Sequence, residues 1–293
     1  MTTRALLILV FLLALSTSTT AVLVGGYPAS TISNSQLQTI AAAIDAWIAN
    51  STVVSTASLV RLSFHDCVGG CDGCINVTNP DNNGLNATAS ALTNFWNTYS
   101  AAHPVRVFDH NMTRADFWAL AGMRAAAIAT ANVPSTQTVP VVVVPPINFR
   151  IGRTNCLNGF NSDERESEGT FPSGISNWTA VLGIFGPGGF GFTDRQIVAL
   201  LGAHALGGLV PKNSGFQGQW VLNPGRLDNS YYRTMTNASN NYQNVPVETS
   251  QFGVLYQWNA TIDATSNRVQ RIMLNTDMSL LKSFVASPIT GQV

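Results

Sequence analysis

The sequence is poor in charge. Only 10% of its 293 residues are Asp, Glu, Lys or Arg, against about 25% in an average domain. Fifteen basic and fifteen acidic residues balance to a formal net charge of zero. Basic patches, internal repeats and low-complexity tracts are absent from the chain. We therefore expect no nucleic-acid partner, and the length fits one large domain or two lobes.

Long apolar runs are also scarce. One run covers 5–15, after Arg4 and before small polar residues that end near Ala21. A secretory signal has an apolar centre of about 7–15 residues, whereas a membrane span needs about 20. We expect 1–21 to be a signal peptide and 22–293 to be the mature, secreted domain, without a membrane attachment after cleavage. An uncleaved anchor is the alternative.

Cysteines are few, and an even number in an oxidising compartment favours disulfides. Four thiolates on zinc are the alternative, but three cysteines within eight residues and one far away give poor zinc spacing. The sequence does not choose among the three disulfide pairings of Cys67, Cys71, Cys74 and Cys156. Seven sequons fit a glycoprotein with N-glycans: Asn50, Asn76, Asn86, Asn111, Asn177, Asn237 and Asn259.

Apolar spacing and capping motifs predict a mostly α protein. The expected helices cover 36–48, 53–64, 113–131 and 197–206, and a last one runs from 275 to about 285. Capping boxes at 113–116 and 193–196 open two of them. The β-like run 139–144 contains proline and is expected to be a connector or an edge strand. Long loops are expected at 66–84, 150–175 and 208–228, and such loops are often functional.

The stretch RLSFHDCVGGCDGC, residues 61–74, concentrates reactive side chains. On a helix, Arg61 and His65 are four residues apart and share a face. A nearby guanidinium disfavours imidazolium, so His65 would stay neutral and act as a base. Arg61 would offer donors to an anion or to developing negative charge. A solvated Arg beside a surface His is the alternative.

A second histidine, His204, lies on the apolar face of the helix expected at 197–206. A histidine in that position is either a satisfied core residue or a neutral imidazole that can hold haem iron. One histidine as iron ligand and another as acid–base group would describe a haem peroxidase.

Six segments, in order, carry a resemblance to the plant, fungal and bacterial haem peroxidase superfamily over residues 36 to 287. They are LVRLSFHDC, NNGL, ADFWALAG with the turn 150–153, DRQIVALLGAHALG, SGFQGQWVLNPGRLDNSYY and LNTDMSLL. The chain resembles a secreted animal member with mixed ascorbate-peroxidase-like and secretory-peroxidase-like features. The resemblance implies a mostly α, two-lobed fold with haem b between distal and proximal helices.

The resemblance also implies site residues. On the distal side, His65 would move the proton of the peroxide, Arg61 would stabilise negative charge and Asn82 would orient the imidazole. Phe64 stands where the intracellular branch has Trp and the secreted plant branch has Phe.

On the proximal side, His204 would bind the haem iron and Asp277 would support it by accepting its ring N–H. Trp220 would either share an oxidising equivalent beside the ligand or serve as core packing.

Several positions depart from the family pattern. Asn213 stands where an arginine helps relatives to bind ascorbate, which puts ascorbate use in doubt. A proximal cation site is depleted, because Ala205 and Val221 replace hydroxyl residues. Asp66 and Asp72 match distal calcium positions, but the usual serine ligand is Cys74. Distal calcium and a disulfide-braced loop that replaces it therefore both stay open.

The sequence as a whole predicts a secreted haem peroxidase that reduces hydrogen peroxide and oxidises small, phenolic or aromatic donors. The alternative is an extracellular matrix or adhesion glycoprotein of peroxidase fold with secondary catalytic activity. The physiological donor, the oligomeric state and the tissue role do not follow from the sequence.

Overall fold

The computed structural model of the chain describes residues 32–103, 112–131, 149–161, 171–265, 269–283 and 290–293. They form two compact units. One comprises the described residues from 32 to 129 together with 149–161, and the other comprises 130–131 and the described residues from 171 to 293. The expected signal peptide, the run 139–144 and the sequon at Asn111 lie outside the described residues.

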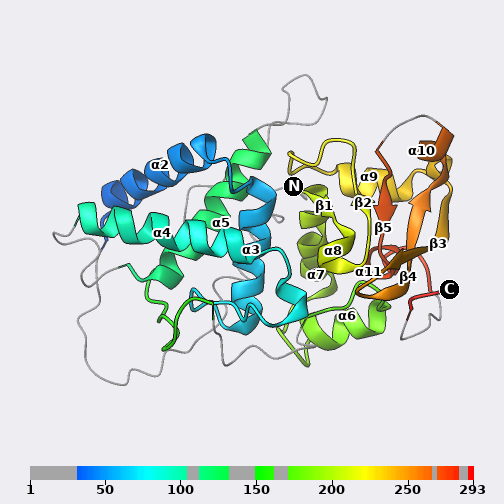
Figure 1. The fold of residues 1–293 in the computed structure, drawn as a ribbon, viewed down its shortest axis with the longest axis horizontal. Helices are drawn as coiled ribbons and strands as arrows, with labels where there is room; N and C mark the ends of the chain where they lie inside the picture. Colours follow the sequence, from blue (N-terminus) through cyan, green and yellow to red (C-terminus); the bar gives the residue numbers. More distant parts are fainter. Residues whose placement is uncertain (1–31, 104–111, 132–148, 162–170, 266–268, 284–289) are drawn as a thin grey trace. The chain divides into compact units, whose positions relative to one another are not determined.

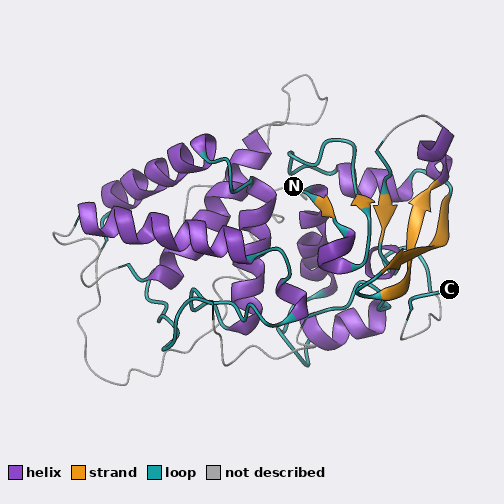
Figure 2. Ribbon diagram, viewed as in Figure 1, coloured by secondary structure: helices purple, strands orange, loops and turns teal. Residues whose placement is uncertain are grey.

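The N-terminal unit is helical (Figures 1 and 2). Its elements are α2 (Asn34–Asn50), α3 (Thr56–Gly69), η1 (Pro80–Asn82), α4 (Asn86–Ala102) and α5 (Arg114–Ala131). Three of these confirm the helices expected at 36–48, 53–64 and 113–131. The helix α4 was not expected from the sequence, although its buried residues recur at helical spacing.

Aromatic and charged contacts join the helices of this unit. The rings of Trp47 in α2 and Phe95 in α4 stack with centroids 4.8 Å apart. Arg124 of α5 donates through Nε to Asp45 of α2 at 2.8 Å. A Cβ on Gly122 of α5 would come within 2.4 Å of the Cβ of Ser63. The missing side chain at Gly122 therefore lets α3, which carries Arg61 and His65, pack directly on α5.

Helix α3 begins with a capping box between Ser55 and Ser58 and ends at Gly69, followed by the C-cap residue Gly70, whose φ is +143°. The side chain of Ser55 accepts the N–H of Ser58, which satisfies a donor of the first turn. The helix is longer than expected at its C-terminal end. Asp66 therefore lies on α3 and not in the loop predicted to begin there.

The capping box expected at Thr113 forms only in part. Asp116 donates its N–H to Oγ1 of Thr113 at 3.0 Å. Its carboxylate instead accepts the backbone N–H groups of Gly152 and Arg153 and the Arg153 guanidinium. The carboxylate that would have completed the capping box with Thr113 thus binds the turn 150–153 instead.

The C-terminal unit combines short helices with two small antiparallel sheets. Its helical elements are α6 (Trp178–Phe185), α7 (Asp194–Leu201), η2 (Gly202–Ala205), α8 (Pro211–Ser214), α9 (Ser230–Thr236), η3 (Ala238–Asn240), α10 (Thr261–Thr265) and α11 (Asn275–Met278). Its strands are β1 (Gly208–Leu209), β2 (Gly218–Gln219), β3 (Tyr242–Thr249), β4 (Gly253–Ala260) and β5 (Ile272–Met273). The described chain is mostly α, as predicted.

Three details of this unit correct the sequence prediction. Strands β3 and β4 form a hairpin, with Tyr242 opposite Ala260 and Thr249 opposite Gly253, where no strand was expected. Helix α7 has the predicted capping box between Thr193 and Gln196 but gives way to the 3₁₀ turn η2 after Leu201. The last helix, α11, is a single turn, much shorter than the predicted 275–285.

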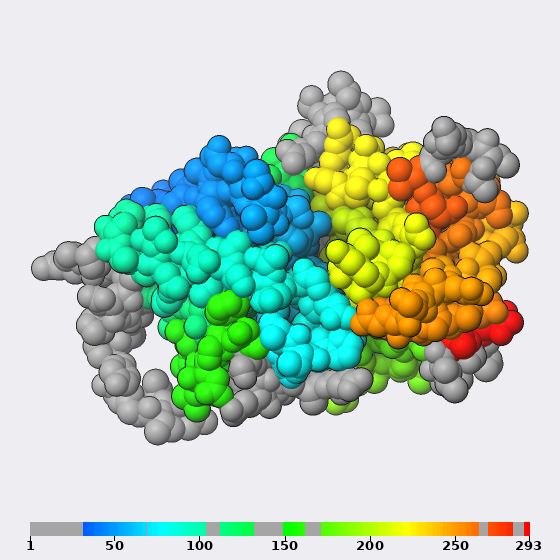
Figure 3. All heavy atoms as spheres, viewed as in Figure 1, coloured from blue at the N-terminus to red at the C-terminus, as the bar shows by residue number. Residues whose placement is uncertain are grey.

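The segment 149–161 lies along the chain that follows α3. Ile75 donates its backbone N–H to the carbonyl of Phe160 at 2.9 Å, and Cys156 donates to the carbonyl of Asp72 at 3.1 Å. In the space-filling view the bright green atoms of this segment adjoin the cyan atoms of the loop after α3 (Figure 3). Of the described helices, none is both long and apolar enough for a membrane span.

Candidate active site

The distal group begins with a buried imidazole on α3. Nδ1 of His65 lies 2.7 Å from Oδ1 of Asn82, in the 3₁₀ turn η1. The amide nitrogen of Asn82 donates to the backbone carbonyl of Asn76 at 2.8 Å. That bond turns the amide oxygen toward the ring, so Nδ1 of His65 carries the proton. The acceptor lone pair of the neutral ring is then on Nε2.

Arg61 lies one turn before His65 on the same helix, as its spacing predicted. Its guanidinium donates to two backbone carbonyls, those of Asn83 at 2.9 Å and Asp81 at 2.8 Å. Both acceptors flank Asn82, so one short segment holds both distal side chains. Burial lowers the pKa of Arg61, and the Asp81 carboxylate raises it in turn. A guanidinium stays charged under these conditions.

Burial and charge act in the same direction on His65. Burial, followed by the nearby positive charge of Arg61, lowers the pKa of His65 to about 3, and the bond to Asn82 only partly opposes this shift. The imidazole is therefore neutral at ordinary pH and available as a base, which is the protonation state inferred from the Arg61–His65 spacing.

Phe64, the expected distal aromatic, is half-buried. Its ring meets the His65 ring edge to face, with centroids 5.6 Å apart and an interplanar angle of 81°. The structure thus places Phe64 next to the distal base.

The Cys/Asp part of the 61–74 stretch forms a disulfide-braced loop. The disulfides are Cys67–Cys71 and Cys74–Cys156, which confirms two bridges and supplies the pairing that the sequence left open. Oδ1 of Asp66 accepts the backbone N–H groups of three loop residues at 2.8–3.2 Å, namely Asp72, Gly73 and Cys74. Calcium on Asp66 and Asp72 stays a prediction, and Cys74 is bonded to sulfur.

The proximal group centres on a buried carboxylate in α11. Nδ1 of His204, in the 3₁₀ turn η2, lies 2.8 Å from Oδ1 of Asp277. The side chain of His204 is 31% exposed, and that of Asp277 is fully buried. With Nδ1 engaged, the remaining ring nitrogen, Nε2, is the one that can bind a metal.

Two further side chains converge on the same carboxylate. The indole Nε1 of Trp220 donates to Oδ2 of Asp277 at 2.8 Å, and its ring stacks on that of His204 with centroids 4.1 Å apart. The hydroxyl of Tyr231 donates to Oδ1 at 2.7 Å. The sequence did not predict that Tyr231 donates to Asp277, although Tyr231 lies in one of the segments that resemble the peroxidases. Helical spacing does not show which acceptor a buried hydroxyl binds.

The carboxylate of Asp277 is held ionised. Burial on its own would raise the pKa of Asp277, but the facing His204 and the hydrogen bonds from His204, Leu274 and Tyr231 lower it below its ordinary value. Burial and the same carboxylate raise the pKa of Tyr231 well above its ordinary value. Tyr231 therefore stays protonated and remains a donor.

The proximal residues fit a haem iron ligand. A ring with one nitrogen bound to a buried carboxylate is fixed in orientation and tautomer and is a more basic ligand through the other nitrogen. Partial exposure leaves His204 accessible for ligation. The structure brings the predicted distal residues together in the N-terminal unit and the predicted proximal residues together in the C-terminal unit.

Comparison with known proteins agrees with this arrangement. The sequence profile of the family described as "Peroxidase" matches residues 40–291. The chain belongs to this family, the haem peroxidases of plants, fungi and bacteria. Members of this family are haem-dependent oxidoreductases.

The relatives are fungal and plant proteins. A protein of Pyricularia oryzae named "Putative heme-binding peroxidase" is 33% identical over 76% of this chain and 67% of its own length. A mitochondrial cytochrome c peroxidase of the same fungus is 29% identical over 63% of this chain and 47% of its own length. L-ascorbate peroxidase 3 of Arabidopsis thaliana is 29% identical over 59% of this chain and 54% of its own length. The chain thus spans about half to two thirds of the length of the curated relatives it matches.

Proposed function

We propose that the protein is a secreted haem peroxidase that reduces hydrogen peroxide with electrons from small phenolic or aromatic donors. One observation carries the proposal. Two histidines each have Nδ1 engaged, His65 by the neutral amide of Asn82 and His204 by the carboxylate of Asp277. The neutral partner suits a ring that takes up and releases a proton, and the anionic partner suits a permanent metal ligand.

Three residues of this chain have separate roles in the proposed reduction of peroxide. Haem, when bound through His204, supplies the iron that exchanges electrons with peroxide and donor. His65 takes a proton from hydrogen peroxide at Nε2 and returns it to the oxygen that leaves as water. Arg61 stabilises negative charge as the O–O bond breaks. Two electrons and two protons, supplied as hydrogen atoms by two phenol molecules, complete the conversion of peroxide to two water molecules.

The haem of this proposal is b-type and non-covalent. The sequence has no Cys-X-X-Cys-His attachment motif, and all four cysteines are in disulfides. Disulfides are typical of oxidising compartments, which supports export by the N-terminal apolar segment. The sequon asparagines Asn50, Asn86, Asn177 and Asn237 are exposed, which leaves these sites accessible to N-glycans.

The haem assignment is tested with the secreted protein and two variants. The parent should bind one acid–butanone-extractable haem with a five-coordinate ferric spectrum. His204→Ala should lose that spectrum, whereas His103→Ala, at the exposed end of α4, should keep it. A His204→Ala protein with the parent spectrum would overturn the assignment of the ligand.

A further inference from the structure

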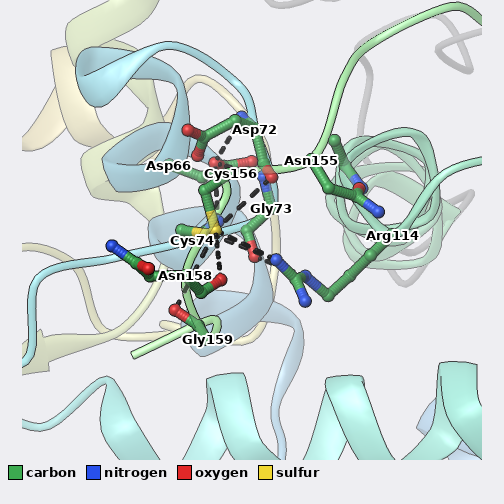
Figure 4. Close-up of a disulfide and its surroundings, with 10 residues drawn as sticks. Asp66, Asp72, Gly73, Cys74, Arg114, Asn155, Cys156, Asn158 and Gly159 are labelled. Atoms are coloured by element: carbon green, nitrogen blue, oxygen red, sulfur yellow. Dashed lines mark hydrogen bonds between the residues drawn. A yellow bond between two sulfur atoms is a disulfide. The ribbon is translucent and has the colours of Figure 1, made fainter. Parts of the chain in front are cut away.

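The disulfide Cys74–Cys156 has a charged neighbour. It joins the loop after α3 to the segment 149–161, with Cα atoms 6.3 Å apart. The guanidinium of Arg114, the first residue of α5, lies against it (Figure 4). One terminal nitrogen is 3.1 Å from each of the two sulfur atoms, and Nε donates to the carbonyl of Gly73 at 2.9 Å.

A fixed positive charge at this distance stabilises the reduced form of the bridge. A disulfide is neutral, whereas its reduction produces thiols whose ionised form is an anion. Positive neighbours lower the pKa of a thiol, and a thiolate of lower pKa is the better leaving group in exchange. Arg114 therefore shifts the reduction equilibrium of the Cys74–Cys156 disulfide toward the open form and raises the rate at which an external thiol opens it.

The two sulfur atoms are not equivalent. Cys74 is fully buried, whereas Cys156 is partly exposed. The carbonyl oxygen of Asn158 lies 3.1 Å from the sulfur of Cys156, and the carbonyl of Asp72 lies 3.8 Å from that of Cys74. The closer carbonyl suits a protonated thiol on Cys156 and leaves the thiolate on Cys74. An external thiol can therefore attack Cys156 and displace Cys74.

We propose that Cys156 is a site of thiol–disulfide exchange, at which a small dithiol opens the Cys74–Cys156 bridge. The attacking thiolate forms a mixed disulfide with Cys156, and Cys74 leaves as a thiolate beside Arg114. The second thiol of the reagent then attacks the mixed disulfide, releases Cys156 as a thiol and departs as a cyclic disulfide. Two electrons pass from the dithiol to the bridge. Hydrogen peroxide can reverse the change, with two thiols and one peroxide giving one disulfide and two water molecules.

The same residues support metal binding less well than they support thiol–disulfide exchange. Asp72, Cys74 and Cys156 place their ligand atoms within 4.8 Å of one another. The guanidinium of Arg114 already lies beside both sulfur atoms, and its charge would repel a cation there. The Asp72 carboxylate opposes a thiolate, but Arg114 donates directly to both sulfur atoms at 3.1 Å and so favours exchange. The observations therefore point to a redox site.

Opening the Cys74–Cys156 bridge would also affect the position of His65 through a short series of contacts. This part of the proposal rests on the proposed function. Cys74 is two residues from Asn76, whose carbonyl holds the amide of Asn82. Asn82 in turn holds His65. The backbone N–H of Cys74 is also one of the three that bind Asp66, the residue after His65. Loss of the bridge would loosen both contacts, so Cys74–Cys156 acts as a positioning element for the distal base.

The exchange site is tested without any activity measurement. The haem-loaded protein is equilibrated with defined ratios of reduced to oxidised dithiothreitol, alkylated, and mapped by mass spectrometry for each cysteine. Arg114→Gln should need about tenfold more reductant to half-open Cys74–Cys156, which corresponds to about 30 mV for a two-electron couple. Arg114→Lys, which keeps the charge, should lie closer to the parent. The Cys67–Cys71 bridge is the internal reference and should shift less than threefold.

The results separate the parts of the proposal. An unchanged midpoint in Arg114→Gln, or equal shifts of both bridges, would overturn the exchange site. The double variant Cys74→Ser/Cys156→Ser, measured without reductant, should react with hydrogen peroxide at least tenfold more slowly than the parent. An unchanged rate would overturn the coupling to His65. A parent protein that never reacts with peroxide would count against the proposed function while the alkylation result still stands.

Discussion

The rings of His204 and Trp220 stack with an interplanar angle of 15°, and both side chains donate to the same carboxylate, that of Asp277. A charge that develops on either ring is therefore felt by the other and by Asp277. Because the carboxylate is fully buried, its interactions are screened little by solvent. The proximal group is best understood as one electrostatic unit in which Tyr231 is the fourth member.

Tyr231 should matter more than its neighbour Tyr232. The Tyr231 hydroxyl donates to a carboxylate, whereas that of Tyr232 donates to the backbone carbonyl of Val198. A hydrogen bond to a charged group contributes about 1.5–3 kcal/mol, and one to a neutral group about 0.5–1.5 kcal/mol. We expect Tyr231→Phe to lower the free energy of unfolding by more than Tyr232→Phe does. Urea unfolding of the two variants measures the difference, and equal losses would contradict a charged acceptor.

His65 should govern the reaction with peroxide. Removing a general acid–base group costs about 10²–10⁴-fold in rate. We expect His65→Ala to slow stopped-flow reaction with hydrogen peroxide by that factor and to slow donor oxidation far less. Arg61→Ala should affect the same step through charge stabilisation. Asn94→Ala, on the exposed face of α4, serves as the control, and parental rates in both distal variants would place the active pair elsewhere.

His65 should also make stability depend on pH. Its pKa is about 3 in the folded protein and about 6.5 in an unfolded chain. Between these values the unfolded state binds a proton that the folded state does not. The free energy of unfolding should therefore fall as pH decreases from about 6.5 toward 3, by at most about 1.4 kcal/mol per pH unit, and be insensitive to His65 above that range.

The pH prediction is measured as the difference between the parent and His65→Leu in urea unfolding at a series of pH values. Asp277, whose pKa is lowered, contributes stability that is lost at more acidic pH, as its carboxylate gains a proton. Because both proteins contain Asp277, its contribution cancels in the difference. A difference that does not change between pH 4 and 6.5 would show that His65 is not held neutral by the fold.

The donor should be a neutral phenol and not ascorbate. Ascorbate is an anion at neutral pH, and Asn213 on α8 offers no charge to bind it. The adjacent Lys212 is exposed, and its ammonium does not reproduce a planar guanidinium fork. We expect kcat/KM for guaiacol to exceed that for ascorbate at equal peroxide concentration. Asn213→Arg should raise only the ascorbate value, and faster ascorbate oxidation by the parent would refute the argument from Asn213.

Part of this protein follows from sequence alone, because some interactions are local. The four-residue spacing of Arg61 and His65 placed them together on α3, and Thr193 with Gln196 marked the start of α7. The same locality explains the failures. The carboxylate of Asp116, expected to complete a capping box with Thr113, binds the distant turn 150–153 instead. The helix expected from 275 to about 285 stops after one turn in α11.

What only the tertiary structure decided involves groups far apart in the chain. The pairing of Cys74 with Cys156 spans 82 residues, and Arg114 reaches both sulfur atoms from the start of another helix. Tyr231 meets Asp277 across 46 residues. A helical or alternating pattern records which face of an element is buried, but it does not record which buried donor meets which acceptor. That choice depends on how separate elements pack, because a buried polar group must find its partner wherever the fold brings one within reach.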